Sequence, residues 1–449
     1  MSTVRLGAAT GWSRDRFGPA EDLVKKGELH YLCFETMSEV TQSEAQVRKL
    51  ENPDIPGYDP YLERRLKPVL RECKEKGIKI ISNQGWIDTV SAAEKVLEIA
   101  KAQGIGSIRV AAIDGGVLTD RIADMGLRFL ETGEPIVDFG DSIVSAEAYL
   151  GAGEIVEVLS NEVDVVLTSR VADSCLYLGP LAYEFNWSFE DWNSLARGTI
   201  VGHLMECAGQ VSGGYFADPG YKNVPALYKV GHPIAEVSED TIYITKASGT
   251  GGLVSTETCK EQLLYEVQDP GNYLCPDLVA DFTTVRFKSA GKDKVEVIGG
   301  TGKPRPPSLK VVVGLREGYM AEEMVLFAGP GALERAELAK SILLNRLQQV
   351  NLMAEEIRMD FLGINSVHRE ASPPPSTTPY EVILRVAIKT DSIEEVEKLR
   401  REIDPMAVNG PAATGKWAPM GNRVRPIVGF RSTLVPREEV STSVVYREL

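Results

Sequence analysis

Short, almost wholly apolar segments alternate with helical patterns along the first part of this chain. The segments that predict strands are Val4–Thr10, Leu29–Thr36, Ile78–Asn83, Ser107–Ile113 and Asp164–Ser169. The helical patterns between them are Tyr61–Gly77, Ser91–Gly104 and Ala146–Asn161. Strands that are apolar on both faces need to be covered on both faces. The alternation therefore predicts an α/β fold with a doubly wound, mainly parallel sheet.

The second half of the chain has a different pattern, with hairpins and covering helices. The expected elements are a hairpin at Thr283–Gly300, an antiparallel pair at Leu309–Leu315 and Glu322–Gly329, a helix at about 333–353, a proline-rich loop at Ala371–Pro379, a strand at Tyr380–Ile388 and a helix at Ser392–Ile403. These elements are typical of a smaller α+β domain. We expect a Rossmann-like α/β domain at residues 1–230 and an α+β domain at residues 231–449.

The charge and composition exclude several kinds of partner. The 449 residues carry a net charge of −15, which argues against nucleic acid or an anionic membrane as the main partner. A run of about 18 apolar residues is absent, and the first residues lack the pattern of a signal peptide. The six cysteines are scattered without a CxxC pair, as is typical of reduced thiols. We expect a cytoplasmic protein without a membrane-spanning segment.

Polar residues and glycines follow the predicted strands. In a doubly wound sheet, ligands bind beyond the carboxyl ends of the parallel strands. The residues at these ends are Thr10, Gly11, Trp12, Glu35, Thr36, Asn83, Gln84, Gly85, Trp86, Asp114, Gly115, Gly116, Ser169, Arg170, Asp173 and Ser174. Among them we expect Thr10, Gly11, Asn83, Asp114 and Ser169 to bind a small polar substrate.

Arg170 and Asp173 lie in the segment "TSRVADS" (Thr168–Ser174) after the last of these strands. The guanidinium of Arg170 presents a planar fork of donors that suits a carboxylate or phosphate. Asp173 could act as a base or hold Arg170 in place. In the alternative interpretation, the two residues form an internal ion pair that only shapes a loop.

His203 and Glu206 are spaced i, i+3 in "GHLMECAGQVSGG" (Gly202–Gly214), so a helix places them on one face. Such a pair could exchange protons with a substrate, or bind a divalent metal together with a third ligand. A buried histidine with satisfied hydrogen bonds is the alternative. The pattern identifies neither a metal nor a cofactor.

The glycine-rich stretch "SGTGG" lies between a predicted strand and a helix rich in hydroxyl residues at its start. We expect Gly249, Thr250, Gly251 and Gly252, with Lys246 before them, to form an anion-binding nest. Neither a Walker A loop nor the dinucleotide motif GxGxxG is present. A structural turn followed by a Ser/Thr helix cap is the alternative.

Several long blocks resemble the acyclic terpene utilisation family typified by AtuA, up to about residue 330. The blocks are "LHYLCFETMSEVT", "GIKIISNQG", "LTSRVADSCLYLGPL", "GHLMECAGQVSGGYF" and "ITKASGTGGLVSTETCKEQLLYEVQDPGNYLCPD". One departure is "NQGWIDT" (Asn83–Thr89), where the family has more glycine, which leaves the roles of Trp86 and Asp88 open. The resemblance implies a place in the catabolism of branched acids, terpenoid acyl-CoA thioesters or similar carboxylates.

Taken together, these features predict a catabolic lyase, hydratase or isomerase that acts on a branched carboxylic acid or its CoA thioester. Asp173, His203 and Glu206 are the expected proton-transfer residues. The alternatives are a non-catalytic partner subunit of an acyl-CoA-processing complex and a metal-dependent lyase or hydrolase. We also expect a homo-oligomer.

Overall fold

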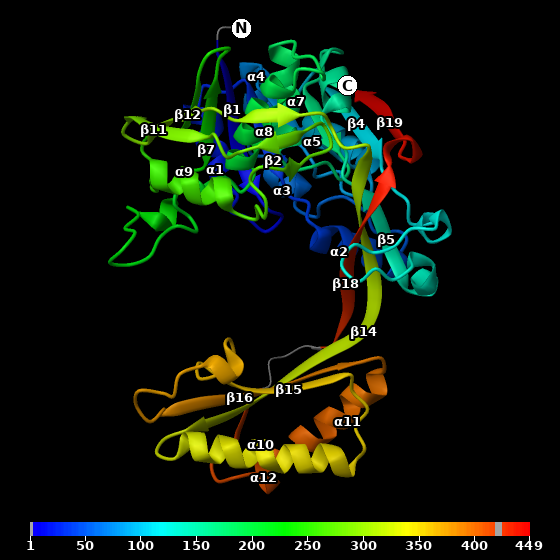
Figure 1. The fold of residues 1–449 in the computed structure, drawn as a ribbon, viewed down its shortest axis with the longest axis vertical. Coiled ribbons are helices and arrows are strands. Elements are labelled where there is room, and N and C mark those ends of the chain that lie inside the picture. The colour runs from blue at the N-terminus through cyan, green and yellow to red at the C-terminus, as the bar shows by residue number, and fades with distance from the viewer. Residues whose placement is uncertain (1–2, 418–423) are drawn as a thin grey trace. The chain divides into compact units, whose positions relative to one another are not determined.

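A computed structural model describes residues 3–417 and 424–449 and divides the chain into two compact units (Figure 1). Unit 1 comprises the residues up to Gly314 together with Phe430–Leu449, and unit 2 is Leu315–Gly429. The predicted boundary at residue 230 is wrong, because residues 231–314 contribute strands to the large sheet of unit 1. Among the described residues, no helix is long and apolar enough to cross a membrane.

Unit 1 is built on a ten-stranded sheet with a parallel centre. Its order is β11-β12-β8-β7-β1-β2-β3-β6-β4-β19. The five parallel strands are β1 (Val4–Gly11), β2 (Tyr31–Glu35), β3 (Lys79–Ser82), β6 (Val165–Thr168) and β4 (Arg109–Gly115). These strands were all predicted from the sequence, and their shared parallel arrangement is confirmed.

Antiparallel strands flank this centre on both sides, so the whole sheet is mixed. They are β7 (Pro233–Val237), β8 (Ile242–Lys246), β11 (Arg286–Gly291), β12 (Lys294–Ile298) and β19 (Thr442–Glu448). The two hairpins β7–β8 and β11–β12 have short connections, which permit only antiparallel pairing. The C-terminal strand β19 returns to pair antiparallel with β4.

Two apolar clusters cover the two faces of the central strands. Neighbouring residues alternate between them: Ile80 and Val165 belong to one cluster, and Ile81 and Val166 to the other. The helices of the first cluster are α1 (Gly18–Lys26), α3 (Leu62–Leu66), α4 (Leu70–Lys76) and α5 (Thr89–Ala102). Those of the second are α6 (Gly153–Leu159), α7 (Cys175–Glu184) and α8 (Trp192–Met205). The helices therefore form a layer on each face, as the apolar strands predict.

Two predicted helices differ from the structure. Tyr61–Gly77 is divided into α3 and α4 at Pro68, because proline cannot donate the backbone hydrogen bond that a continuous helix needs. In Ala146–Asn161, the first residues belong to the strand β5 (Ile143–Ala148), and only α6 is helical. Alanine and glutamate favour helices, but the buried environment of β5 overrides that preference.

The remaining elements of unit 1 surround the sheet. They are α2 (Glu39–Glu51), α9 (Thr256–Leu264) and a small antiparallel sheet of β9 (Tyr273–Leu274), β10 (Val279–Asp281) and β13 (Thr301–Lys303).

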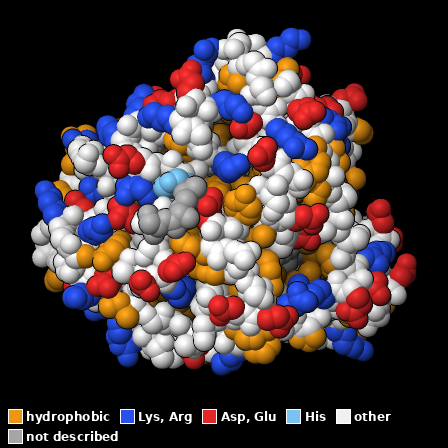
Figure 2. Space-filling model, turned by 90° about the horizontal axis from the view of Figure 1, so that it is seen from above, with side chains coloured by type: hydrophobic (Ala, Val, Ile, Leu, Met, Phe, Trp, Pro, Cys, Tyr) orange, Lys and Arg blue, Asp and Glu red, His pale blue; other side chains and the backbone are white. Residues whose placement is uncertain are grey.

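All six cysteines are free thiols, and five of them are buried. Acidic and basic side chains are interspersed over the face shown in Figure 2.

Unit 2 has the element order of a ferredoxin-like fold, β-α-β-β-α-β. The elements are β14 (Ser308–Ala328), which begins in unit 1, α10 (Ala332–Gln349), β15 (Glu356–Leu362), β16 (Glu381–Thr390), α11 (Ile393–Ile403), the short α12 (Met406–Asn409) and β17 (Gly415–Trp417). The antiparallel sheet has the order β15-β16-β14-β17, and one apolar cluster joins it to α10 and α11.

One prediction in this region is wrong. Leu309–Leu315 and Glu322–Gly329 do not form an antiparallel pair, because both lie on the single 21-residue strand β14. The residues between them include Gly318, whose φ of +81° would suit a turn. A second strand, β18 (Arg425–Pro436), pairs with β14.

Candidate functional site

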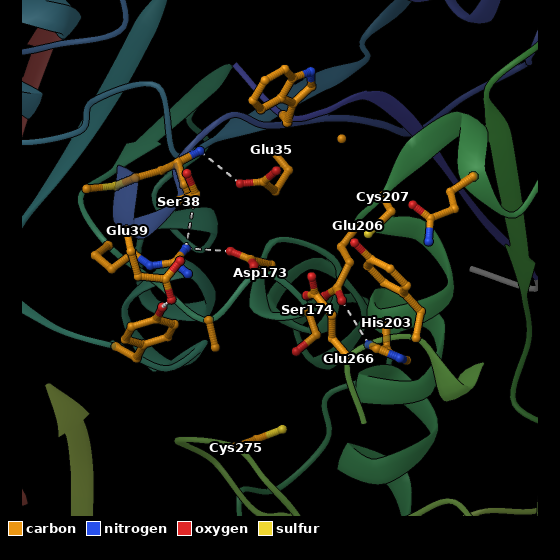
Figure 3. A pocket seen from close by; sticks show the side chains of 18 of the residues that line it. Glu35, Ser38, Glu39, Asp173, Ser174, His203, Glu206, Cys207, Glu266 and Cys275 are labelled. Carbon is orange, nitrogen blue, oxygen red and sulfur yellow. Dashed lines mark hydrogen bonds and ion pairs between the residues drawn. The ribbon is translucent and has the colours of Figure 1, made fainter. Parts of the chain in front are cut away.

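A cavity of about 930 Å³ lies in unit 1, at the carboxyl ends of β1 and β2 and the C-terminal end of α8 (Figure 3). The ionisable groups in its wall include Asp15, Arg16, Glu35, Glu39, Arg170, Asp173, His203, Glu206, His232, Glu266 and Lys310. Six of these are carboxyl groups and three are cationic side chains, so acids outnumber permanent cations. Because acidic groups predominate, this wall suits a neutral ligand group that can form hydrogen bonds better than it suits a ligand carboxylate.

Glu35 is the last residue of β2 and is 6% exposed. Its Oε1 accepts hydrogen bonds from the backbone N–H of Met37 at 2.8 Å and from Nδ2 of Asn83 at 3.1 Å. Figure 3 shows Glu35 in the cavity wall. Its Oε2 forms no hydrogen bond with the described residues. Burial raises the pKa of Glu35 well above its usual range, and the nearby Asp173 raises it further, against the opposing charge of Arg170. Burial therefore favours the protonated form of this carboxyl, and Oε2 is the oxygen with room to carry the proton.

Arg170 is a largely buried residue of the cavity wall and forms an ion pair with Asp173. Its Nη1 lies 2.5 Å from Oδ1 of Asp173 and also donates to the backbone carbonyls of Met37 and Val171, at 2.8 and 3.1 Å. The guanidinium stacks 4.0 Å above the ring of Tyr149. The structure therefore shows the internal Arg–Asp pair that the sequence left open as an alternative.

His203 and Glu206 form a hydrogen-bonded dyad at the end of α8. His203 Nδ1 lies 2.8 Å from Oε1 of Glu206, and Nε2 lies 3.2 Å from the carbonyl of Leu263. The carbonyl can only accept, so Nε2 carries a hydrogen and the exchangeable proton lies between Nδ1 and Glu206. Burial opposes the charged ring, but the charge and hydrogen bond of Glu206 outweigh it and raise the pKa of His203. Burial also raises the pKa of Glu206.

The packing of α8 explains how this dyad reaches the cavity. A Cβ on Gly202 would lie 2.4 Å from the backbone oxygen of Ser174, so only glycine lets α8 approach this closely. The ring of His203 then stacks on Phe282, with the ring centroids 5.5 Å apart. In Figure 3, Asp173 lies between Glu35 and the dyad.

A second group of side chains, Glu39, Tyr149 and Lys310, joins α2, the end of β5 and β14. The Tyr149 hydroxyl is hydrogen-bonded to Oε1 of Glu39, and Nζ of Lys310 lies 4.8 Å above the Tyr149 ring. The Tyr149 backbone N–H donates to the Lys310 carbonyl at 2.9 Å, which aligns the two residues. Lys310 is half-exposed, and its Nζ lies 3.9 Å from Oε1 of Glu39, which is a loose ion pair.

Of the five strand-end residues expected to bind substrate, Gly11 lines the cavity, whereas Thr10, Asn83, Asp114 and Ser169 do not. Thr10 donates its hydroxyl hydrogen to the Glu35 carbonyl at 2.7 Å, and Asn83 is fully buried against Glu35 and Thr36. Gly11 lines the cavity and lies against the Cys207 backbone, which a Cβ would meet at 2.4 Å. Ser169 donates to the Gly115 carbonyl, and Asp114 pairs with Ser443 on β19.

Trp86 and Asp88, where the sequence departs from the family, have structural contacts. Trp86 Nε1 donates to the Thr36 hydroxyl at 3.2 Å. Asp88 caps the N-terminus of α5 by accepting from Ser91 N–H. Neither residue lines the cavity.

The glycine-rich loop does not form an anion-binding nest. Gly251 N–H donates to the Lys229 carbonyl at 2.9 Å, and Gly252 N–H donates to the Pro225 carbonyl at 2.8 Å. Lys246 Nζ pairs with Asp293 at 3.2 Å, and Thr250 Oγ1 donates to the Ala247 carbonyl. None of Lys246 and Gly249–Gly252 lines the cavity. Backbone carbonyls of the neighbouring loop already accept hydrogen bonds from the amides of Gly251 and Gly252. Ser255 forms a capping box at the start of α9, as the alternative interpretation predicted.

Sequence reasoning did not select several of the cavity residues. Glu35 was named from the sequence as a strand-end residue but was not assigned a role, and it is the last residue of β2. Asp15, Tyr149, His232 and Lys310 are brought in by distant parts of the chain and carry no local motif.

The His203–Glu206 pair does not have the geometry of a metal site. Both ring nitrogens of His203 are engaged in hydrogen bonds. Among residues 3–417 and 424–449, no group of three His, Cys, Asp or Glu side chains is arranged to hold a metal ion. The dyad geometry therefore favours proton transfer.

The structure is that of a mixed α/β protein with a cavity whose wall is rich in carboxyl groups. The family model described as "Acyclic terpene utilisation family protein AtuA" matches residues 4–446, so the chain belongs to this family. The description associates the family with acyclic terpene utilisation, which is a catabolic role.

Comparison with curated proteins gave no match. Among solved structures, prephenate dehydratase from Streptococcus mutans is similar at 12% sequence identity. That match covers 38% of this chain and 66% of the other, just under two thirds of its length, with a TM-score of 0.14. A TM-score this low supports no conclusion about fold or activity.

Proposed function

We propose that this protein is a catabolic lyase, hydratase or isomerase that moves a proton at the carbon next to the carbonyl of a branched acyl group. The observation that carries the proposal is the pairing of two distinct proton-handling groups in one buried cavity. These are the His203–Glu206 dyad and the carboxyl of Glu35, whose pKa is raised by burial. Environments that push the pKa values of neighbouring groups in this way are typical of acid–base enzymes.

The dyad is suited to exchange the proton on the α-carbon. Glu206 lines the cavity, and His203 behind it can share the proton through the 2.8 Å contact. A carboxyl whose pKa is raised by burial is a stronger base when ionised than an exposed one. Glu206 therefore takes the α-proton, and His203 stabilises either protonation state of the pair.

Glu35 is suited to stabilise the negative charge that then develops on the carbonyl oxygen. Its Oε1 is occupied by the Met37 and Asn83 donors, which leaves the Oε2–H free to donate. A neutral carboxylic acid in an apolar site donates a strong hydrogen bond to an enolate oxygen. No free cation is needed for this role, which agrees with the pairing of Arg170 to Asp173.

The charge distribution favours a CoA thioester over a free acid as the substrate. The deep wall carries more carboxyl groups than cations, and a thioester carbonyl is neutral where a carboxylate would be repelled. Anionic groups of the carrier would lie near Lys310 or Arg16, the cavity cations that are not buried in an ion pair.

The convergence of Arg170, Asp173, His203 and Glu206 favours a catalyst over a partner subunit without activity. A scaffold needs no buried acid and base in one cavity. The alternative of a metal-dependent enzyme gains no support from the engaged nitrogens of His203.

The experiment is an exchange assay with branched acyl-CoA thioesters and their free acids in D2O. The wild-type protein should exchange the α-hydrogen of a thioester. Glu206→Gln should lower that rate about 10²–10⁴-fold, the usual contribution of a general base. Glu261→Gln, on the exposed face of α9, is the matched control. The proposal would be contradicted if no compound of the panel exchanged its α-hydrogen and none raised the melting temperature of the protein.

A further inference from the structure

Two hydrogen-bond acceptors face each other across another part of the same cavity, at Asp15 and His232. Both residues line the cavity, and Nε2 of His232 lies 3.9 Å from Oδ2 of Asp15. This distance is too long for a direct hydrogen bond. The proposed roles of Glu35 and the His203–Glu206 dyad leave these two groups without a function.

The backbone fixes the tautomer of His232. Its Nδ1 lies 3.1 and 3.2 Å from the carbonyls of Ala8 and Ala9, where the register of β1 shifts. Carbonyls only accept hydrogen bonds, so Nδ1 carries the hydrogen. Burial lowers the pKa of His232, so the ring is neutral and Nε2 presents a lone pair.

Asp15 is also held firmly in place. Its Oδ2 accepts from Gly11 N–H at 2.9 Å, and its Oδ1 accepts from Arg16 N–H at 2.7 Å. The buried guanidinium of Arg65 donates to the carbonyls of Ser13 and Asp15, at 2.6 and 3.2 Å. The loop that carries this carboxylate is therefore anchored independently of any ligand.

The gap between the two acceptors has the dimensions of one water molecule. If a donor atom lay about 2.8 Å from both Nε2 and Oδ2, the angle Nε2–donor–Oδ2 would be roughly 90°. This is close to the angle between the two O–H bonds of water. A substrate hydroxyl has one hydrogen and could satisfy only one acceptor. A Cβ on Gly209 would lie 3.5 Å from Nε2, so this glycine leaves the approach open.

We propose that Asp15 and His232 bind the water that reacts with the acyl substrate, so that the reaction is hydration of a 2-enoyl thioester or its reverse. This inference rests on the proposed function and selects one reaction within it. It assigns the β-carbon of the substrate to the Asp15–His232 side of the cavity and the α-carbon to the dyad.

The step balances without an added co-reactant. The water oxygen bonds to the β-carbon, and one water proton moves to Nε2 of His232. The π electrons move toward the α-carbon and the carbonyl, whose oxygen accepts a hydrogen bond from Glu35. The dyad then delivers its proton to the α-carbon, and the proton on His232 returns to the dyad through solvent. The net change is the addition of one water molecule across the C=C bond.

The first test is a crystal structure of the full-length protein and of Gly209→Ala. The wild type should contain an ordered water within hydrogen-bond distance of both Nε2 and Oδ2. The added methyl, at ordinary van der Waals distance from the ring, should displace it without unfolding the chain. An empty gap, or a direct His232–Asp15 hydrogen bond, would overturn the inference.

The second test separates hydration from proton exchange, with a panel of branched 2-enoyl-CoA and saturated acyl-CoA thioesters. Gly209→Ala and Asp15→Asn should lower hydration at least about 100-fold while α-hydrogen exchange continues. Gly153→Ala, where a Cβ meets nothing within 4 Å, is the control. Isomerisation without hydration would overturn this inference and leave the proposed function standing. If the wild-type protein showed no α-hydrogen exchange, that result would instead contradict the proposed function.

Discussion

Glu147 is a buried carboxyl that forms no ion pair with any residue in the described ranges 3–417 and 424–449. It lies on β5 at 1% exposure, and its Oε1 accepts a hydrogen bond from Nε2 of Gln46 on α2 at 3.0 Å. Burial raises its pKa to about 7, against the hydrogen bond of Gln46 and the more distant charge of Arg170, while Asp114 adds to the rise. The folded protein therefore holds the proton of Glu147 more tightly than the unfolded chain does.

The first prediction is that Glu147→Gln stabilises the protein at alkaline pH. The protonated carboxyl makes its full contribution to the free energy of unfolding below its ordinary pKa of 4.5. This contribution is lost as the pH rises through about 7. The amide cannot ionise, so the variant should gain about 3 kcal/mol near pH 8 and almost nothing near pH 4.5. Thermal unfolding of both proteins across this range measures the difference. An equal effect at both ends would show that the carboxyl is not buried as described.

The second prediction concerns Arg170, whose single Nη1 serves three acceptors. Arg170→Lys removes the planar group that stacks on Tyr149. The lysine side chain is one bond shorter, so its ammonium should not reach the position of Nη1, and the hydrogen bonds to the Met37 and Val171 carbonyls should weaken. We expect a loss of about 1–3 kcal/mol in the free energy of unfolding. If the melting temperature is unchanged and acyl-CoA binds more weakly, the result would instead support the anion-binding role that the sequence predicted for Arg170.

At the scale of elements, the loop from Ser248 to Leu253 shows why a glycine-rich stretch before a helix is ambiguous. A Cβ on Gly251 would lie 2.1 Å from the Ala226 carbonyl oxygen and 3.1 Å from that of Lys229. The glycine is needed because another loop packs against this one, and α9 is capped separately by Ser255.

The third prediction is that Gly251→Ala destabilises the protein without changing the cavity. The clash involves backbone atoms, which cannot rotate away, so the loss should exceed that of Ser255→Ala, which removes a helix cap worth about 1 kcal/mol. Melting temperatures of the two variants give the order. The rate of α-hydrogen exchange should stay at the wild-type value in Gly251→Ala, and a selective loss of that rate would contradict the structural role.

At the scale of the whole molecule, unit 1 is discontinuous in sequence. Its last strand, β19, pairs with β4 over seven residues, from Thr442 opposite Gly115 to Glu448 opposite Arg109. Val444 and Tyr446 pack on one apolar cluster of the sheet and Val445 on the other. The end of the chain therefore covers the edge of the parallel centre.

The fourth prediction is that a chain ending at Glu439 loses stability throughout unit 1. Removing β19 exposes the edge of β4 and the partly buried side chains beneath it, at a cost on the order of 3 kcal/mol. Hydrogen exchange should then be faster in β4 and β6 than in unit 2, which has its own apolar cluster. A chain that lacks only Leu449 is the control, and equal stability of the two truncated chains would be the contrary result.

Local pattern alone determined the parallel centre of the sheet and its two helical layers. The five strands are short, apolar and separated by helices, and few other arrangements bury them. The i, i+3 spacing likewise predicted that His203 and Glu206 lie on one face of a helix, and in the structure the two side chains are hydrogen-bonded to each other. Arg170 and Asp173, three residues apart, form the pair that the sequence offered as one of two interpretations.

Only the tertiary structure decided which distant groups meet. From the sequence, the Gly251 amide could donate to a ligand or to a backbone carbonyl. In the structure it donates to the carbonyl of Lys229, in a loop whose position no local pattern specifies. The apposition of Asp15 and His232, and of Tyr149 and Lys310, depends on strand register across the sheets. Periodicity specifies which face of an element is buried, whereas the partner of each polar group depends on packing between segments far apart in the chain.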